Sequence, residues 1–295
     1  MKHKAREVEK GKKQKRGKIF LWGFLSLLLL CVLLGFFLKN RYLGRRLVIQ
    51  KGEKSIYGRL FLPAWGKAPL VILGHGYGGS YSDNLDYGRF FADHGVACYC
   101  FDFCGGSRES KSSGRMEDMS LLTEMEDMRD ILEALQKEKR VEKSGIFLAG
   151  KSLGGAVAAL VGAEKETEIA GLILHYPFFV VSEALQERMK QAAGSGEAAG
   201  TGEKESSGGE GKESPQVVAE DVFERIATFR GPVILFNGDK DKYVPLENTQ
   251  KACEAYENAK LVVLKGSGHG FSGKARDTVK EKMVSFVWEV MKERE

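Results

Sequence analysis

Gly150-Lys151-Ser152-Leu153-Gly154-Gly155 follows the apolar run Ile146-Phe147-Leu148-Ala149 and leads into the small-residue stretch Ala156-Val157-Ala158-Ala159. This order predicts a strand, a sharp turn and a helix, with the pattern Gly-x-Ser-x-Gly at the turn. A serine on such a corner has a strained backbone, so the residues two before and two after it must lack bulk. The corner exposes the serine hydroxyl beside the N–H groups that begin the helix.

This turn resembles the nucleophile elbow of the α/β-hydrolases, and the chain from about residue 46 to its end fits one domain of that fold class. Short apolar runs alternate with helical patterns there, which predicts a mostly parallel eight-stranded sheet flanked by helices. The strands are expected at 47–50, 56–62, 70–73, 96–102, 145–149, 171–175, 233–236 and 260–264. Apolar residues at helical spacing between Val279 and Met291 predict the last helix.

The resemblance implies that an acid and then a histidine follow the serine in the chain. The hydroxyl needs a base to take its proton, and that base needs a third group to orient it. Of the five histidines, His269 is the last, and it lies in the glycine loop 266–271. Asp241 fits the Gly-x-x-Asp-x-x-Val-Pro segment that carries the acid in many relatives, while Asp239 is a competitor that could instead cap a turn. The predicted triad is Ser152, Asp241 and His269.

An oxyanion hole requires two backbone donors aimed at the negative charge that develops in the reaction. The resemblance places one donor at the N–H of Leu153, the residue after the nucleophile. The apolar run 70–73 ends in Gly74-His75-Gly76-Tyr77-Gly78-Gly79, which resembles the His-Gly loop of the family and makes the N–H of Tyr77 the second donor. An ordinary turn or a phosphate cradle is the alternative for this glycine run, but no Gly-Lys-Ser/Thr ending follows it.

The N-terminal region predicts a membrane anchor. Residues 1–18 are crowded with Lys and Arg, and 19–38 is a charge-free stretch long enough to cross a hydrocarbon core as a helix. A cleaved signal peptide would have a shorter apolar region and a small-residue cleavage site. We therefore predict a basic cytoplasmic tail at 1–18 and a transmembrane signal anchor at 19–38. The excess of basic residues before the span favours a cytoplasmic N-terminus and an extracellular catalytic domain at the cell membrane.

The same tail explains the net positive charge. Residues 1–46 carry 13 basic and 2 acidic side chains, so the remaining chain, with 32 basic and 38 acidic side chains, is acidic. We therefore predict no nucleic-acid partner and expect the tail to contact membrane lipid. Cys98, Cys100 and Cys104 lie close together without a matching histidine cluster, which predicts neither a disulfide framework nor a zinc site.

Residues 176–229 fall between the sixth and seventh predicted strands, where α/β-hydrolases insert their lid. Within this region, about 190–216 is rich in Gly, Ser, Glu and Lys and nearly free of large apolar side chains, so we predict a disordered insertion. A flexible lid that leaves the active site open and a surface insertion that the fold tolerates are both compatible with this composition. The flanks are expected to supply the cap and the walls of a substrate site.

Over about residues 46–292 the chain resembles bacterial α/β-hydrolases of the feruloyl/cinnamoyl esterase and serine aminopeptidase-like group. The likeness includes 102–107 and 117–120, although many relatives carry Gly-His-Gly where this chain has Gly105-Gly106-Ser107. It implies a serine hydrolase that cleaves a small-molecule carboxylic ester through an acyl-enzyme intermediate, with no cofactor. A peptidase or amidase that uses the same triad stays open, as does an inactive hydrolase-fold binding or scaffold protein.

Overall fold

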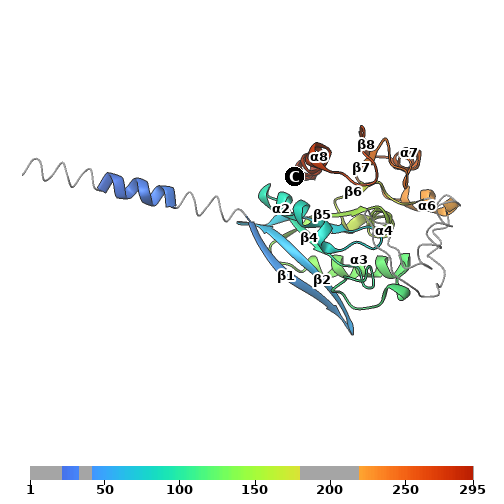
Figure 1. Cartoon of the computed structure of the whole chain (residues 1–295), viewed down its shortest axis with the longest axis horizontal. Helices are drawn as coiled ribbons and strands as arrows, with labels where there is room; N and C mark the ends of the chain where they lie inside the picture. The colour runs from blue at the N-terminus through green and yellow to red at the C-terminus, as the bar shows by residue number, and fades with distance from the viewer. Residues whose placement is uncertain (1–21, 33–41, 180–218, 295) are drawn as a thin grey trace, which may run out of the picture. The chain divides into compact units, whose positions relative to one another are not determined.

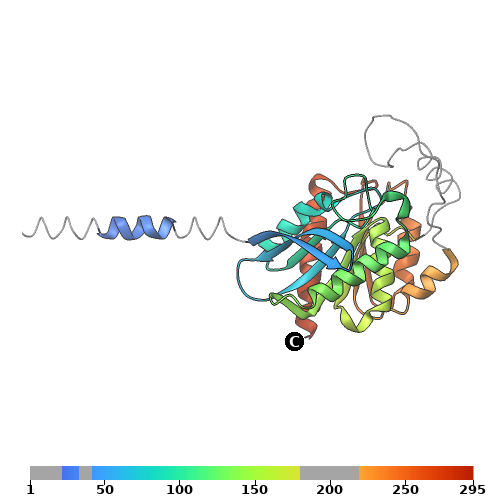
Figure 2. The same ribbon diagram turned by 90° about the horizontal axis from the view of Figure 1, so that it is seen from below.

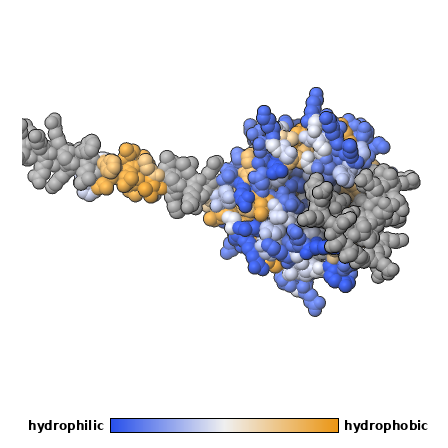
Figure 3. Space-filling view, viewed as in Figure 1, coloured by the Kyte–Doolittle hydropathy of each residue, from blue (hydrophilic) through white to orange (hydrophobic). Residues whose placement is uncertain are grey.

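The structure is a computed structural model that describes residues 22–32, 42–179 and 219–294. The chain divides into two units, Met1–Arg41 and Tyr42–Glu295. In the first unit, 22–32 form a helix with exposed and largely hydrophobic side chains (Figure 3). None of the helices in the described ranges is both long enough and apolar enough to cross a membrane. The predicted basic tail at 1–18, and the two ends of the predicted span at 19–38, lie outside the described residues.

The second unit is built on one sheet with the strand order β1-β2-β4-β3-β5-β6-β7-β8 (Figure 1). Its strands are β1 (Tyr42–Lys51), β2 (Lys54–Pro63), β3 (Ala68–Gly74), β4 (Ala97–Phe101), β5 (Val141–Lys151), β6 (Gly171–His175), β7 (Val233–Gly238) and β8 (Ala259–Leu264). β1 and β2 pair antiparallel, as do β2 and β4, and all other neighbours are parallel. The prediction of a mostly parallel eight-stranded sheet is confirmed.

β1 begins earlier than the sequence pattern indicates. It pairs with β2 along its whole length, from Tyr42 opposite Pro63 to Lys51 opposite Lys54. Most of its side chains are exposed, because it is the edge strand, and the polar Arg45-Arg46 pair hides the alternation that predicts a strand. The expected domain start at residue 46 therefore falls inside β1.

Helices cover both faces of the sheet (Figure 2). One core cluster lies between the sheet and α2 and α8, and another lies between the sheet and α3, α4, α6 and α7. Burial of both sheet faces explains why strands such as β3 and β6 are continuous apolar runs. The helices are α2 (Leu85–Asp93), α3 (Leu121–Leu135), α4 (Leu153–Glu164), α6 (Ala219–Ile226), α7 (Leu246–Ala255) and α8 (Gly273–Arg294), with short 3-10 helices η1 (Tyr81–Asn84), η2 (Met116–Asp118) and η3 (Glu166–Glu168).

Only the two ends of the predicted lid region, 176–229, are described. Phe179 on one side and Val222, Ile226 and Phe229 on the other are buried in the main core cluster. The described flanks therefore contribute to the core of the domain. The predicted disordered insertion at 190–216 lies outside the described residues.

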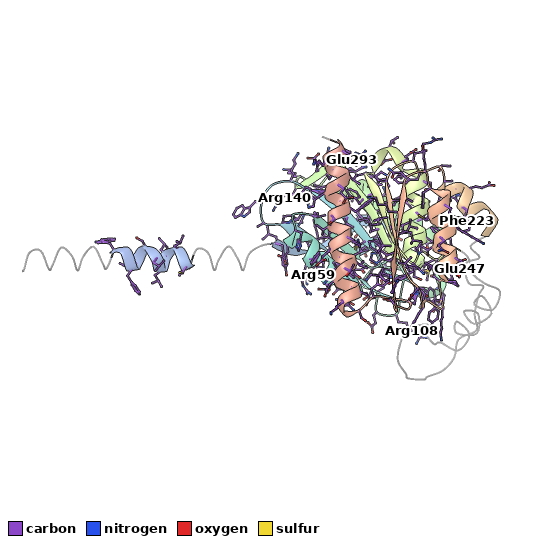
Figure 4. The ribbon with its side chains drawn as sticks, turned by 90° about the horizontal axis from the view of Figure 1, so that it is seen from above. Arg59, Arg108, Arg140, Phe223, Glu247 and Glu293 are labelled. Carbon is purple, nitrogen blue, oxygen red and sulfur yellow. The ribbon has the colours of Figure 1, made fainter. Side chains whose placement is uncertain are left out.

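The parallel strands end at one common edge of the sheet. Lys151, the last residue of β5, pairs with His175 of β6, which pairs in turn with Phe236 of β7. Figure 4 shows Arg108 and Glu247, which follow β4 and β7, toward one end of the domain, and Glu293 of α8 at the opposite end. Segments that follow the strands therefore meet at this edge, where ligands bind in open α/β sheets.

Candidate active site

Ser152 is the turn residue between β5 and α4, and its backbone is strained. Its φ of 52° and ψ of −118° lie outside the regions that L-residues favour, a conformation that costs about 1–3 kcal/mol. Two backbone hydrogen bonds hold the turn: the N–H of Ser152 donates to the carbonyl of His175 and the N–H of Phe178 donates to the carbonyl of Ser152, both over 3.0 Å. The predicted strand, sharp turn and helix are all present.

The two glycines of the pattern are required by close backbone contacts. A Cβ atom at Gly150 would lie 2.0 Å from the carbonyl oxygen of Gly154, and one at Gly154 would lie 2.2 Å from the carbonyl oxygen of His75. Neither contact is relieved by moving a flexible side chain, because both involve main-chain atoms. The residues two before and two after the serine therefore lack bulk for the steric reason expected from the sequence.

His269 and Asp241 are hydrogen-bonded to each other. Nδ1 of His269 lies 2.9 Å from Oδ2 of Asp241. The other carboxylate oxygen, Oδ1, accepts the backbone N–H groups of Tyr243 and Val244, each over 2.9 Å. The Asp241 side chain is buried and held at both oxygens. It therefore orients the imidazole with Nδ1 as the donor, which leaves Nε2 as the nitrogen that can accept a proton.

Asp239, the competing acid, has a different contact. Its Oδ1 accepts the backbone N–H of Gly266 over 2.6 Å, and the N–H of Lys240 donates to the carbonyl of Ser267 over 2.9 Å. These bonds connect the loop after β7 to the loop that carries His269. Asp239 is therefore placed to support the histidine loop, while Asp241 contacts the histidine itself.

Two tyrosine rings flank His269; the sequence placed Tyr176 only in a flank expected to supply the cap and substrate walls, and it gave Tyr243 no role. The ring centroids of Tyr176 and Tyr243 lie 4.5 Å and 5.3 Å from that of the imidazole. Tyr176 directly follows β6 and adopts a φ of 36°, which is unusual for a bulky residue. Ser152 and His269 form no hydrogen bond in this conformation. Such bonds are often formed only once substrate is bound.

The two predicted oxyanion donors belong to loops that meet at the serine. Leu153 is the first residue of α4, so its N–H has no partner within the helix. The loop after β3 carries Tyr77, and a Cβ atom at the preceding Gly76 would lie 3.2 Å from Cβ of Ser152. Neither N–H donates to another group among the described residues. The geometry therefore leaves both donors available beside the serine.

His75, one residue before Gly76, orients this loop, a role that sequence reasoning did not assign. It is 1% exposed, its Nδ1 lies 2.7 Å from the carbonyl oxygen of Gly76, and its Nε2 accepts the N–H of Phe103 over 3.1 Å. Burial lowers the pKa of His75, which favours the neutral tautomer that makes both bonds. The Gly76 carbonyl and the Tyr77 N–H belong to one planar trans peptide, so they point in opposite directions. The bond that holds the carbonyl therefore also fixes the direction of the N–H. In the sequence, the signal for this role was the position of His75 in a glycine run directly after a strand.

The loop that departs from the Gly-His-Gly of relatives packs against the same histidine. A Cβ atom at Gly106 would lie 2.9 Å from Cε1 of His75 and 3.0 Å from Cβ of Phe103. The N–H of Gly106 also donates to the carbonyl of Phe103 in a tight turn. In this loop conformation position 106 has no space for a histidine side chain.

The cysteines and acidic residues of the described ranges form no metal site. No group of three or more His, Cys, Asp or Glu side chains in those ranges is arranged to hold a metal ion. Cys98, Cys100 and Cys104 are free thiols, and burial raises the pKa of Cys98 and Cys104, which favours the unreactive thiol over the thiolate.

Comparison with known proteins shows that the chain is similar to hydrolases. Residues 67–198 match the family model described as serine aminopeptidase, S33, and residues 212–293 match the model described as TAP-like protein. Est1E of Butyrivibrio proteoclasticus, in a structure with ferulic acid bound, is similar at 25% identity and a TM-score of 0.66, over 83% of this chain and 99% of that one. A monoacylglycerol lipase of Paleococcus ferrophilus shares the fold, with 18% identity and a TM-score of 0.60 over 80% of this chain and 99% of that one. An uncharacterised protein of Mycobacterium tuberculosis is 25% identical over 242 residues, which are 77% of this chain and 72% of the relative.

Proposed function

Because the chain belongs to the α/β-hydrolase superfamily, we propose that it is a serine hydrolase that cleaves carboxylic esters. The observation that carries this proposal is the 2.9 Å hydrogen bond between His269 and Asp241, made on the sheet edge where the strained Ser152 follows β5. A base with a fixed tautomer, on the same edge of the sheet as a serine on a sharp corner, fits the arrangement that acyl transfer requires.

In the proposed reaction, Oγ of Ser152 attacks the acyl carbonyl carbon while its proton passes to Nε2 of His269. The backbone N–H groups of Tyr77 and Leu153 stabilise the negative charge on the carbonyl oxygen. The tetrahedral intermediate then expels the alcohol, which takes the proton from His269 and leaves the acyl group on Ser152. Water, deprotonated by the same histidine, releases the acid and restores the serine. Asp241 stabilises the imidazolium that forms in both steps.

A peptidase or amidase that uses the same residues is the second candidate, because a matching family model is described as serine aminopeptidase. Recognition of a free amino terminus needs an accessible negative charge. Glu124 of α3 acts electrostatically on Tyr77 in the loop after β3 (75–79, called the oxyanion loop below), but it is 1% exposed. Burial also raises the pKa of Glu124 well above its usual range, which favours the uncharged acid. Glu124, the one acidic residue of the described ranges found to act on Tyr77, is thus unsuited to hold an ammonium group and gives the peptidase no support.

The experiment is a mixed panel of aryl esters, short acyl esters and aminoacyl amides, assayed with the purified protein. We expect saturable turnover of esters, with kcat/KM for amides lower by about 100-fold or more. Faster turnover of aminoacyl amides would replace the esterase proposal with the peptidase. No turnover of any class by a folded protein would contradict both and favour the binding or scaffold protein.

We also propose that residues 19–38 anchor the protein in the cell membrane, with the catalytic domain outside. The support is the length of the charge-free stretch and the nine basic residues before it. In membrane fractions the full chain should resist extraction by alkaline carbonate and dissolve in detergent. Protease added to protoplasts, whose wall is removed while the cell membrane stays closed, should degrade the domain. Release by carbonate would contradict anchoring, and protection from the protease would contradict the orientation.

A further inference from the structure

Lys151, the residue before the nucleophile, connects the elbow to a neighbouring segment of the chain. The last residue of β5 and half-buried, it extends its amino group toward η1 and α2. Nζ donates to the main-chain carbonyl of Asp83 over 3.0 Å and lies 4.3 Å from the ring centroid of Tyr87. A charged ammonium strengthens both contacts, the first as a charge-assisted hydrogen bond and the second as a cation–π interaction.

From Asp83, further bonds lead to the loop that carries the Tyr77 N–H. The carboxylate of Asp83 accepts the N–H of Ser80 over 2.8 Å. Next to Ser80, the N–H of Gly79 donates to the carbonyl of Gly76 over 3.1 Å, and that carbonyl belongs to the same peptide as the Tyr77 N–H. Lys151 and Ser152 are adjacent, so one side chain connects the turn of the nucleophile to the segment of the second oxyanion donor.

Charged and titratable groups from several elements act on the Lys151 ammonium. Burial lowers the pKa of Lys151 to about 8, and Arg276 of α8 contributes in the same direction, while Asp83, Cys100 and Asp86 oppose it. The ammonium in turn acts to lower the pKa of His75 in the oxyanion loop, Cys98 of β4 and His175 of β6. The hydrogen bond from Lys151 to Asp83 is therefore stronger near neutral pH than in mildly alkaline solution.

We propose that Lys151 is a positioning residue that holds the oxyanion loop against the nucleophile elbow through Asp83, and that its deprotonation sets an alkaline limit on turnover. This inference rests on the proposed hydrolase function. The contacts of the Lys151 amino group are with the carbonyl of Asp83 and the ring of Tyr87. Lys151 acts by keeping the Tyr77 N–H where the negative charge forms, and a displaced donor lowers kcat more than it raises KM.

The first test is the pH profile of ester turnover between pH 6 and 10. We expect kcat of the wild type to fall by about 10- to 100-fold around pH 8, with KM little changed. Lys151→Met should have this lowered kcat already at pH 7 and show no alkaline fall. Lys151→Arg keeps a cation at every pH tested and should lose the fall near pH 8. Lys143→Met, an exposed lysine near the other end of β5, is the matched control and should behave as wild type.

The free energy of unfolding is a separate measurement, and its contribution from Lys151 should change with pH in the direction opposite to turnover. The folded-state pKa of Lys151 is about 8 and its ordinary value is 10.5, so between these values the unfolded chain binds more protons than the native one. The free energy of unfolding of the wild type should therefore rise relative to Lys151→Met as pH rises through this window. An alkaline fall in turnover is thus not caused by Lys151-linked loss of stability.

Amide hydrogen exchange tests the link without any substrate. Residues 76–84 should exchange at least about 10-fold faster in Lys151→Met than in wild type at pH 7, and Lys143→Met should leave them unchanged. Equal exchange in Lys151→Met and wild type would overturn the inference, as would an alkaline fall that persists in Lys151→Met. If turnover is absent altogether, the proposed function fails, while the exchange rates still decide the structural link.

Discussion

Replacing Ser152 with alanine is expected to lower kcat for ester turnover by about 10⁴-fold or more. In the proposed reaction every turnover passes through a covalent bond to Oγ, so its removal eliminates the pathway. Stability should hardly change, within about 1 kcal/mol, because Oγ makes no hydrogen bond to His269 and the backbone bonds to His175 and Phe178 remain. Steady-state kinetics and thermal unfolding of the same preparation measure both quantities.

Two controls separate chemistry from strain. Ser152→Gly should be as inactive as the alanine variant but more stable by about 1 kcal/mol, since glycine adopts a φ of 52° without steric cost. Ser144→Ala, at an exposed position earlier on β5, should keep full activity. If Ser152→Ala retained more than about 1% of wild-type turnover, Ser152 would not be the nucleophile.

Local features of this domain could be predicted from sequence because short-range sterics determine them. The elbow is one such feature: a serine between glycines after an apolar run leaves the chain few ways to turn. The edge strand β1 was only partly predicted, because exposed positions need not be apolar and Arg45 and Arg46 interrupt its pattern. Its extent depends on pairing with β2, which no local pattern encodes.

The candidate site shows the same division between local and non-local information. The sequence identified His269 by its late position, but the contact that distinguishes Asp241 from Asp239 depends on how the loops after β7 and β8 meet. The contact of Tyr176 with His269 was not predicted, because its ring reaches the histidine across a large sequence separation. His75 precedes Ser152 in the chain, so the expected order of the triad excluded it as the base. Its contacts with Gly76 and Phe103 depend on how the loops after β3 and β4 meet.

Replacing Asp241 with asparagine is expected to lower kcat by about 10³- to 10⁴-fold near neutral pH. Oδ1 of Asp241 accepts the backbone N–H groups of Tyr243 and Val244, and an asparagine keeps these bonds only if its oxygen occupies that position. Its NH₂ group then replaces Oδ2 opposite Nδ1 of His269. Two donors cannot bond, so the imidazole takes the other tautomer, with hydrogen on Nε2, and that nitrogen can no longer accept the serine proton.

Asp239→Asn is the matched control, because it makes the same chemical change two residues away. Its side-chain oxygen can still accept the N–H of Gly266, so we expect turnover within about 10-fold of wild type. The variants should unfold at similar temperatures, which excludes loss of folded protein as the cause of the difference. If Asp239→Asn were the more damaging change, the triad would contain Asp239 in solution, and the loops after β7 and β8 would have to rearrange to bring that carboxylate to His269. If neither change reduced turnover, orientation of His269 by a carboxylate would play no part in the reaction.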